Sequence, residues 1–182
     1  MKIILAMIIS CMSGISEGRI VPAGAEDIYS YAIVDVDGDS IQLDQFRGKK
    51  MLFVNLATSS PIAAQIGELQ VLHERYGSSV VVIGFPSNSF GHETRSGLGV
   101  RAYCGAQYEA DFRLTAVSDV AGADCQPVYQ WLMDAAKNGV TSVTIQSDFQ
   151  KVLLNGEGRI VGLFAPSVSP LDSSLINAIL EN

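Results

Sequence analysis

The sequence predicts an α/β fold in which helices flank a mixed central sheet, with a β-hairpin at the N-terminal end. Residues 50–57 form an almost unbroken apolar run, which is typical of a strand covered on both faces of a parallel sheet. Residues 62–76 then repeat apolar side chains at helical spacing, and residues 80–85 form a second apolar run. A strand, a helix and a strand with short connections make a right-handed βαβ unit.

The composition fits a single domain whose surface would not attract nucleic acid or an anionic membrane. The chain has 182 residues, of which 48% are hydrophobic, so it can bury a core of ordinary size. Its formal net charge of -7 and the absence of a basic stripe argue against nucleic acid and against an anionic membrane surface. The glycines and the aspartates lack the spacing of a phosphate-binding loop or a calcium loop, so we expect no cofactor and no metal.

The first 25 residues are similar to a secretory signal peptide. A short charged start is followed by an apolar stretch over residues 3–12, which is too short to span a bilayer. Residues 23–25 (AGA) fit an AxA-type cleavage site. The sequence therefore predicts a signal over residues 1–25 and an exported mature domain over residues 26–182, periplasmic or secreted.

The sequence also offers a second position at which the signal peptide would end. Residues 8–11 (IISC) resemble the lipobox of bacterial lipoproteins, which would place a lipid on Cys11. In that case Cys11 would anchor the domain, and this anchor would be its one link to a membrane. Simple cleavage is the preferred interpretation.

The elements follow in order. Residues 33–36 and 41–43 alternate around Asp37 and Gly38, which is a strong signal for a β-hairpin. After the first apolar strand, residues 58–60 offer hydroxyl caps and Pro61 suits the first position of a helix. This helix is expected to end at Gly77.

The second half continues with weaker signals. In chain order these are a loop over 86–99, a short helix over 100–107, a strand over 112–117, a helix from Gln126 or Pro127, a hairpin over 149–154 and 159–164, and a helix over 170–180. A βαβ half joined to a β-hairpin and a terminal helix is the thioredoxin-like arrangement.

Four segments in the same order resemble the glutathione peroxidase family, over about residues 28–180. They are residues 48–57 before the active turn, residues 85–91 (FPSNSFG, similar to the family's FPCNQFG), residues 124–132, and residues 165–171 (APSVSPL, similar to the family's PTTSPL). Each segment alone is weak, and the four together are specific.

The resemblance implies reduction of hydrogen peroxide or a lipid hydroperoxide by a cysteine or selenocysteine, supported by glutamine, tryptophan and asparagine. The corresponding positions here hold Ser60, Ser89, Ser147 and Asp148, the last two because residues 147–151 (SDFQK) match the family's WNFEK. All four residues differ. A thiolate attacks the peroxide bond and becomes a sulfenic acid, whereas a serine hydroxyl stays protonated and has no such cycle. Asp148 adds negative charge beside the site, which disfavours an anionic nucleophile.

We therefore expect a family member that has lost peroxide reduction, with no confident catalytic residue. Its predicted role is that of a non-catalytic binding module. The partner would be a protein or a peptide at the former active-site cleft around Ser60, Ser89 and Asp148.

Two cysteines of the predicted domain offer an alternative. Cys104 lies where thioredoxin-dependent members of the family keep a resolving cysteine, and Cys125 follows about twenty residues later. In an exported protein the preferred interpretation is a disulfide, which would stabilise the fold by roughly 3 kcal/mol. The functional alternative is a redox-active pair in a thiol-dependent peroxidase or a disulfide-exchange protein of the oxidative-stress response. Free thiols are the third option.

A hydrolytic role for Ser60 would require a base. The two histidines of the chain are His73, several turns along the helix and too far away, and His92, in the loop after the second apolar strand. We expect His92 to be a solvated loop residue and Ser60 to be a helix cap.

Overall fold

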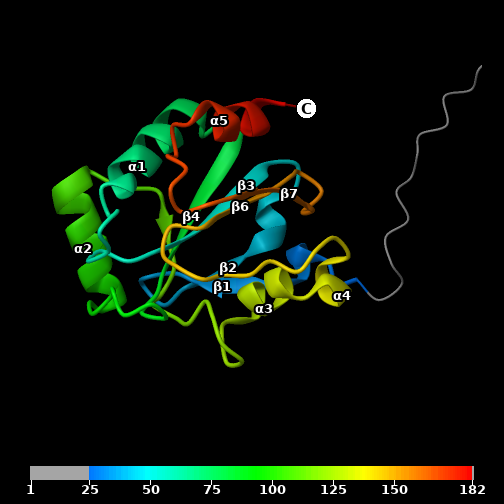
Figure 1. Cartoon of the computed structure of the whole chain (residues 1–182), viewed down its shortest axis with the longest axis horizontal. Helices are drawn as coiled ribbons and strands as arrows, with labels where there is room; N and C mark the ends of the chain where they lie inside the picture. The colour runs from blue at the N-terminus through cyan, green and yellow to red at the C-terminus, as the bar shows by residue number, and fades with distance from the viewer. Residues whose placement is uncertain (1–24, 182) are drawn as a thin grey trace, which may run out of the picture.

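A five-stranded mixed sheet forms the centre of the computed structural model, which describes residues 25–181 (Figure 1). Its strands, in the order in which they lie, are β5 (Arg113–Leu114), β4 (Val80–Pro86), β3 (Lys50–Leu56), β6 (Lys151–Leu154) and β7 (Ile160–Phe164). Strands β3, β4 and β5 are parallel, and β6 and β7 are antiparallel to their neighbours. This confirms the predicted thioredoxin-like α/β fold with a mixed sheet.

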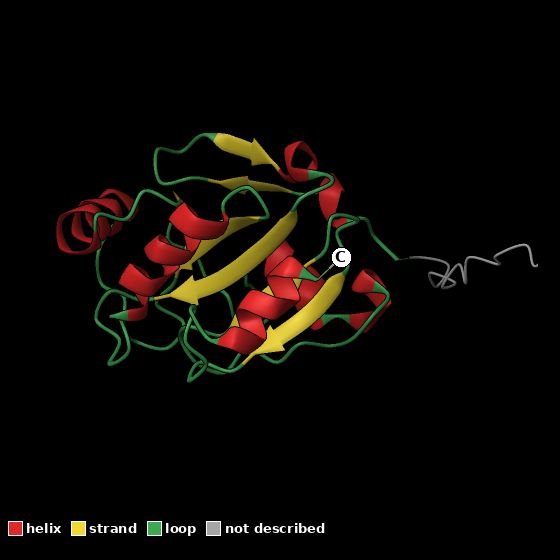
Figure 2. Cartoon of the chain, turned by 90° about the horizontal axis from the view of Figure 1, so that it is seen from above, coloured by secondary structure: helices red, strands yellow, loops and turns green. Residues whose placement is uncertain are grey.

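Helices cover both faces of the sheet, as the two views in Figures 1 and 2 show. They are α1 (Gln65–Tyr76), α2 (Gly97–Tyr108), α3 (Pro127–Met133), α4 (Ala135–Asn138) and α5 (Ser173–Leu180). Helices α1 and α5 lie on one side of the sheet, and α3 and α4 lie on the other (Figure 1).

The central sheet separates two hydrophobic cores. Because side chains alternate along a strand, Met51 and Phe53 of β3 belong to one core while Leu52 and Val54 belong to the other. The first core includes Trp131 and its neighbours on α3, and the second includes the buried faces of α1, α2 and α5. Every residue of β3 after Lys50 is buried, which explains its uninterrupted apolar sequence.

The N-terminal hairpin is also confirmed. Strands β1 (Ala32–Val34) and β2 (Ser40–Gln42) pair antiparallel and follow a short 3₁₀ helix, η1 (Ile28–Ser30). A second 3₁₀ helix, η2 (Leu43–Phe46), leads from the hairpin to β3. In the turn, Gly38 has a positive φ of 91°, a conformation that glycine adopts without steric cost.

The first long helix starts later than the sequence predicts. Pro61 was expected at its first position, but α1 begins at Gln65 and residues 61–64 form turns. In this segment the backbone hydrogen bonds connect residues three apart rather than four apart. Examples are Ala63 N–H to the Ser60 carbonyl and Gln65 N–H to the Ile62 carbonyl. The tighter turn extends the loop after β3 by about one helical turn.

The predicted signal over residues 1–25 and the lipid site at Cys11 lie outside the described residues, apart from Ala25. Within the described residues, none of the helices is both long enough and apolar enough to span a membrane.

The β6–β7 turn provides a test of the fold. Gly158 has a φ of 77°, and a Cβ placed on it would lie 2.4 Å from Cγ2 of Ile28 and 2.9 Å from Cε2 of Tyr29. Gly158→Ala therefore meets both backbone strain and a clash, and we expect it to lower the free energy of unfolding by about 2–3 kcal/mol. The matched control is Gly38→Ala, which has a φ of 91° but no atom within 4 Å of the new Cβ. Urea unfolding checks this, and equal losses in the two variants would contradict the packing of η1 on this turn.

The buried lysine of β6 provides a second test. Lys151 is fully buried, its ammonium donates to the Phe149 carbonyl at 2.8 Å, and burial lowers its pKa from 10.5 to about 8. The unfolded chain therefore binds more protons between pH 8 and 10.5, so wild-type stability should rise with pH in this window relative to Lys151→Met. The full difference corresponds to about 3 kcal/mol. Lys49→Met, at an exposed position, should show no such trend in pH-dependent urea unfolding.

Candidate functional site

Three loops meet at the end of the sheet where β3 and β4 finish. One loop follows β3, one follows β4, and the third precedes β6, whose start lies beside the end of β3 because the two strands are antiparallel. Asn55 joins the first and third loops. Its side-chain amide donates to the Ser147 carbonyl at 2.8 Å, and its backbone carbonyl accepts from Phe149 N–H at 2.6 Å. The carboxyl ends of parallel strands are a common place for a binding site in open α/β sheets.

Ser60 lies in the first loop with little exposed surface. The residue is 8% exposed, and its hydroxyl makes no hydrogen bond to any residue from 25 to 181. Ala64 occupies the N-cap position of α1, without a side-chain cap. The prediction that Ser60 is a helix cap is therefore wrong, because the helix starts a turn later and leaves the hydroxyl unused.

His92 pairs with Asp148 and is not merely a solvated loop residue. Nδ1 of His92 lies 2.6 Å from Oδ2 of Asp148, and their side chains are 45% and 5% exposed. The other carboxylate oxygen, Oδ1, is buried without a hydrogen-bond partner in the described chain. The His92 carbonyl accepts from Ser59 N–H at 3.1 Å, which ties the pair to the residue before Ser60.

The backbone beside Asp148 is strained. Phe149 is fully buried and has a φ of 61°, in the left-handed region that bulky residues rarely adopt. Such strain persists only where the surroundings fix it, here by the bond from Phe149 N–H to the Asn55 carbonyl. This strained residue directly follows Asp148, whose side chain contacts His92.

Ser89 and Ser147, the other two positions that the sequence motifs predict for the site, are placed differently. The Ser89 hydroxyl lies 2.9 Å from Ser87 Oγ and accepts from Val120 N–H at 3.0 Å, so it is held by the loop before α3. Ser147 meets the site through its carbonyl, which Asn55 contacts. The hydrogen bonds thus bring Ser60's loop together with Asp148, while those of Ser89 lead elsewhere.

A hydrogen-bond network centred on the buried Glu93 carboxylate stabilises the loop around Ser60. The Glu93 carboxylate, 1% exposed as a residue, accepts from Thr58 N–H at 2.8 Å, from the Thr58 hydroxyl and from Arg95 N–H. The Arg95 guanidinium donates to the Thr58 hydroxyl at 2.6 Å and covers the Tyr103 ring at 4.3 Å. This network compensates the buried charge of Glu93 and fixes the two loops together.

Sequence reasoning missed this network and the pairing of His92. One signal was present, since Thr58, Glu93 and Arg95 follow the ends of two adjacent parallel strands. The pairing with Asp148 had no local signal, because 56 residues separate the two side chains.

The predicted disulfide between Cys104 and Cys125 is not formed. Both are free thiols. Cys104, on α2, packs in the core that α1 and α5 also line, and Cys125 packs in the core on the other face of the sheet. The sheet lies between them, so a bond would require the fold to rearrange. Burial and the nearby Glu93 carboxylate raise the pKa of Cys104 to about 11, and burial raises the pKa of Cys125.

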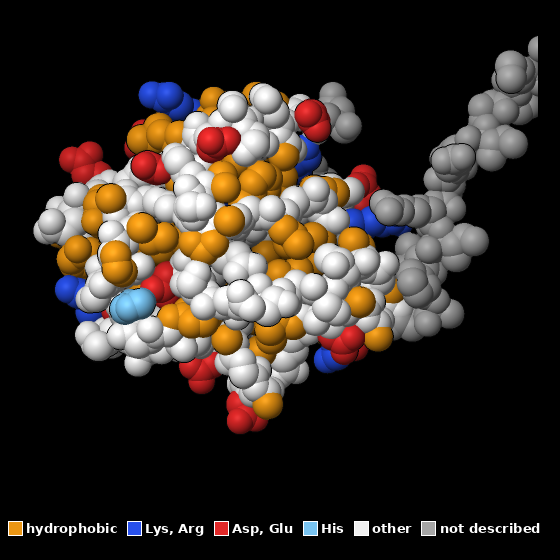
Figure 3. All heavy atoms as spheres, in the orientation of Figure 1, with side chains coloured by type: hydrophobic (Ala, Val, Ile, Leu, Met, Phe, Trp, Pro, Cys, Tyr) orange, Lys and Arg blue, Asp and Glu red, His pale blue; other side chains and the backbone are white. Residues whose placement is uncertain are grey.

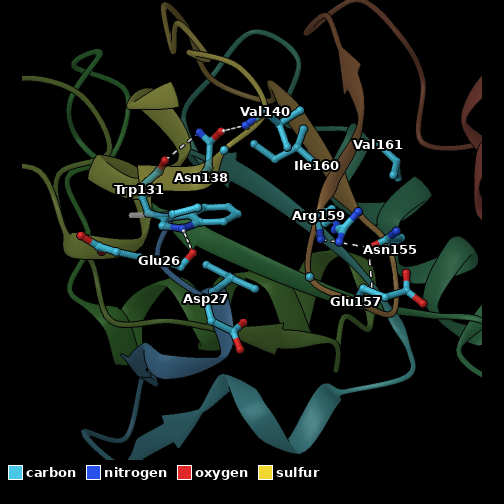
Figure 4. Close-up of a pocket in the computed structure, with 14 residues that line it drawn as sticks. Glu26, Asp27, Trp131, Asn138, Val140, Asn155, Glu157, Arg159, Ile160 and Val161 are labelled. Carbon is cyan, nitrogen blue, oxygen red and sulfur yellow. Dashed lines mark hydrogen bonds between the residues drawn. The ribbon is translucent and has the colours of Figure 1, made fainter. Parts of the chain in front are cut away.

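A separate cavity of about 470 Å³ lies at the opposite end of the strands (Figure 4). The turn between β6 and β7 forms one wall, with Asn155, Glu157 and Arg159, and Trp131 and Asn138 lie across from it. The indole of Trp131 donates to the Glu26 carbonyl at 2.8 Å, which fixes the start of the described chain there. None of Ser60, Ser89, Ser147 or Asp148 lines this cavity.

The surface view shows no concentration of basic side chains on the face it presents. Hydrophobic side chains gather near the middle of this face, and charged side chains of both signs lie around its rim (Figure 3). Among the residues the structure describes, no group of three or more His, Cys, Asp or Glu side chains could hold a metal ion.

Known proteins share both the sequence pattern and the fold. A family model described as glutathione peroxidase matches residues 28–133. A glutathione peroxidase homolog, BsaA of Staphylococcus epidermidis, is 33% identical over 147 residues, covering 80% of this chain and 92% of that protein. A crystal structure described as Trgpx in apo form has 26% identity and a TM-score of 0.65, covering 86% of this chain and 97% of that one.

A more distant structure has the same fold. A thiol:disulfide interchange protein of the thioredoxin family from Chlorobium tepidum TLS has a TM-score of 0.58 at 17% identity, covering 82% of this chain and 92% of that one. On the family match and the relative that is one-third identical, this chain belongs to the glutathione peroxidase family.

Proposed function

We propose that this chain has lost the family's thiol-based peroxide reduction and acts as a binding module at the former active site. The observation that carries this proposal is where the cysteine side chains of the domain lie. Ser60 occupies the turn where the family's nucleophile is expected, and the thiols of Cys104 and Cys125 are both buried with raised pKa values. A peroxide-reducing cysteine needs the opposite conditions, an accessible and readily ionised thiol.

The surface around Ser60 supports the binding role. The Ser60 hydroxyl has no partner among the described residues, and the His92 imidazole is about half exposed. Both groups can donate or accept a hydrogen bond, so they suit a polar segment of a protein or a peptide. The surrounding loops are held by the Glu93 network, which lowers the entropy that binding would cost.

A thiol-based function through Cys104 and Cys125 is the alternative. It requires a rearrangement that exposes Cys104, because the residue is 0% exposed. It also requires a path between two cysteines on opposite faces of the sheet. These requirements make the alternative weaker than the binding role.

Export is also a proposal. It is supported by the apolar stretch over residues 3–12 and the AGA sequence at 23–25, with lipidation of Cys11 as the other outcome. Mass spectrometry of the mature N-terminus distinguishes cleavage after residue 25 from a lipid on Cys11.

The loss of peroxide reduction predicts a negative result in a direct assay. The purified domain, given hydrogen peroxide or a lipid hydroperoxide with glutathione or thioredoxin, should consume peroxide no faster than the reductant alone. The Staphylococcus epidermidis homolog serves as the comparison protein in the same assay. Turnover well above background would overturn the proposal, and its loss in Cys104→Ser or Cys125→Ser would establish the thiol-based alternative.

The buried cysteines predict slow thiol chemistry in the folded domain. With a pKa of about 11, Cys104 is ionised to roughly one part in a thousand at pH 8. We expect a domain that begins at residue 26 to show no rapid reaction with a disulfide reagent, and two reactive thiols after unfolding in urea. A rapid reaction of one thiol in the native state, absent in Cys104→Ser, would contradict the burial seen here.

A further inference from the structure

We propose that Ser60, His92 and Asp148 form a nucleophile, a general base and an orienting carboxylate for acyl transfer from small activated esters. This inference goes beyond the proposed function and does not depend on it, because the reaction involves no change of oxidation state. It joins three residues from three loops that the fold brings to the end of β3.

The His92–Asp148 pair has the form of a catalytic base and its orienting acid. The acid is buried and contacts Nδ1 at 2.6 Å, so it fixes the orientation of the ring. Nε2 forms no hydrogen bond to the described residues, and the side chain is 45% exposed, so this nitrogen can accept a proton. The second carboxylate oxygen of Asp148, Oδ1, is buried without a hydrogen-bond partner among the described residues.

Ser60 is suited to the part of nucleophile. Its hydroxyl has no partner in the described chain, and its loop is tied to the base through the bond from Ser59 N–H to the His92 carbonyl at 3.1 Å. The N–H groups of Ile62 and Ala64, in the turn that leads into α1, have no acceptor among residues 25–181 and can stabilise an oxyanion. Apo sites often hold such groups farther apart than the reacting complex does.

The proposed reaction is balanced without a redox partner. The Ser60 oxygen attacks the ester carbonyl carbon while its proton passes to Nε2 of His92. The bond from the carbonyl carbon to the leaving oxygen then breaks, and the leaving oxygen takes the proton from His92. Water, deprotonated by His92, hydrolyses the acyl-serine and restores the hydroxyl. Because Ser60 is 8% exposed, we expect only a small acyl group to fit.

The test uses a fluorophosphonate probe, which phosphonylates activated serines with loss of fluoride. The probe should label the purified domain at Ser60, located by mass spectrometry of peptides. Ser60→Ala should abolish this labelling. His92→Ala and Asp148→Asn should slow it at least tenfold while leaving the thermal midpoint within a few degrees of wild type. The matched controls Ser59→Ala and His73→Ala, at the adjacent serine and the other histidine, should be labelled at the wild-type rate.

Chemical rescue separates a base from a structural role. Free imidazole should restore labelling in His92→Ala, and should fail to do so in the double variant with Asp148→Asn, which cannot hold the added imidazole. The proposal is overturned if the folded wild type is not labelled, if the label lies on another residue, or if His92→Ala is labelled at the wild-type rate. A peroxide assay run on the same samples reports separately on the proposed function.

Discussion

Strand β3 is the constraint on which the rest of the structure depends. It is buried along six of its seven residues and pairs with β4 on one side and β6 on the other. This double pairing fixes the end of the strand, and with it the turn that carries Ser60. It also brings the start of β6 to the same end, so that Asp148 meets the loop after β4. A shift of β3 by one residue would exchange the side chains of the two cores and displace every group of the site.

The same sheet explains the behaviour of the cysteines. Because successive side chains of a strand point to opposite faces, the sheet divides the interior into two cores that share no side chains. Cys104 and Cys125 belong to different cores, and each is a small apolar residue in its surroundings. Two cysteines about twenty residues apart suggested a bridge, but separation along the chain carries no information about which face of a sheet a residue occupies.

The site at the end of β3 combines a serine hydroxyl with a paired histidine and carboxylate. The loop after β3 carries the Ser60 hydroxyl, and the buried carboxylate of Asp148 is paired with the imidazole of His92. Near a thiolate, the charge of Asp148 would be unfavourable. Beside the His92 ring, the same carboxylate contacts Nδ1 at 2.6 Å. Ser60 and Asp148 therefore both agree with the proposed loss of peroxide reduction.

The sequence by itself determined the fold class, the order of the elements and the family. Apolar runs, helical spacing and turn residues report local preference and burial, and these decide where strands and helices form. It also identified Ser60, Ser89, Ser147 and Asp148 as the positions to inspect, through motifs that are local in the chain. Only the tertiary structure decided that α1 starts at Gln65, that Ser60 caps no helix, and that the two thiols are apart. It alone joined His92 to Asp148 and Glu93 to Thr58, because contacts across 56 and 35 residues depend on how strands pair and leave no periodic trace in the sequence.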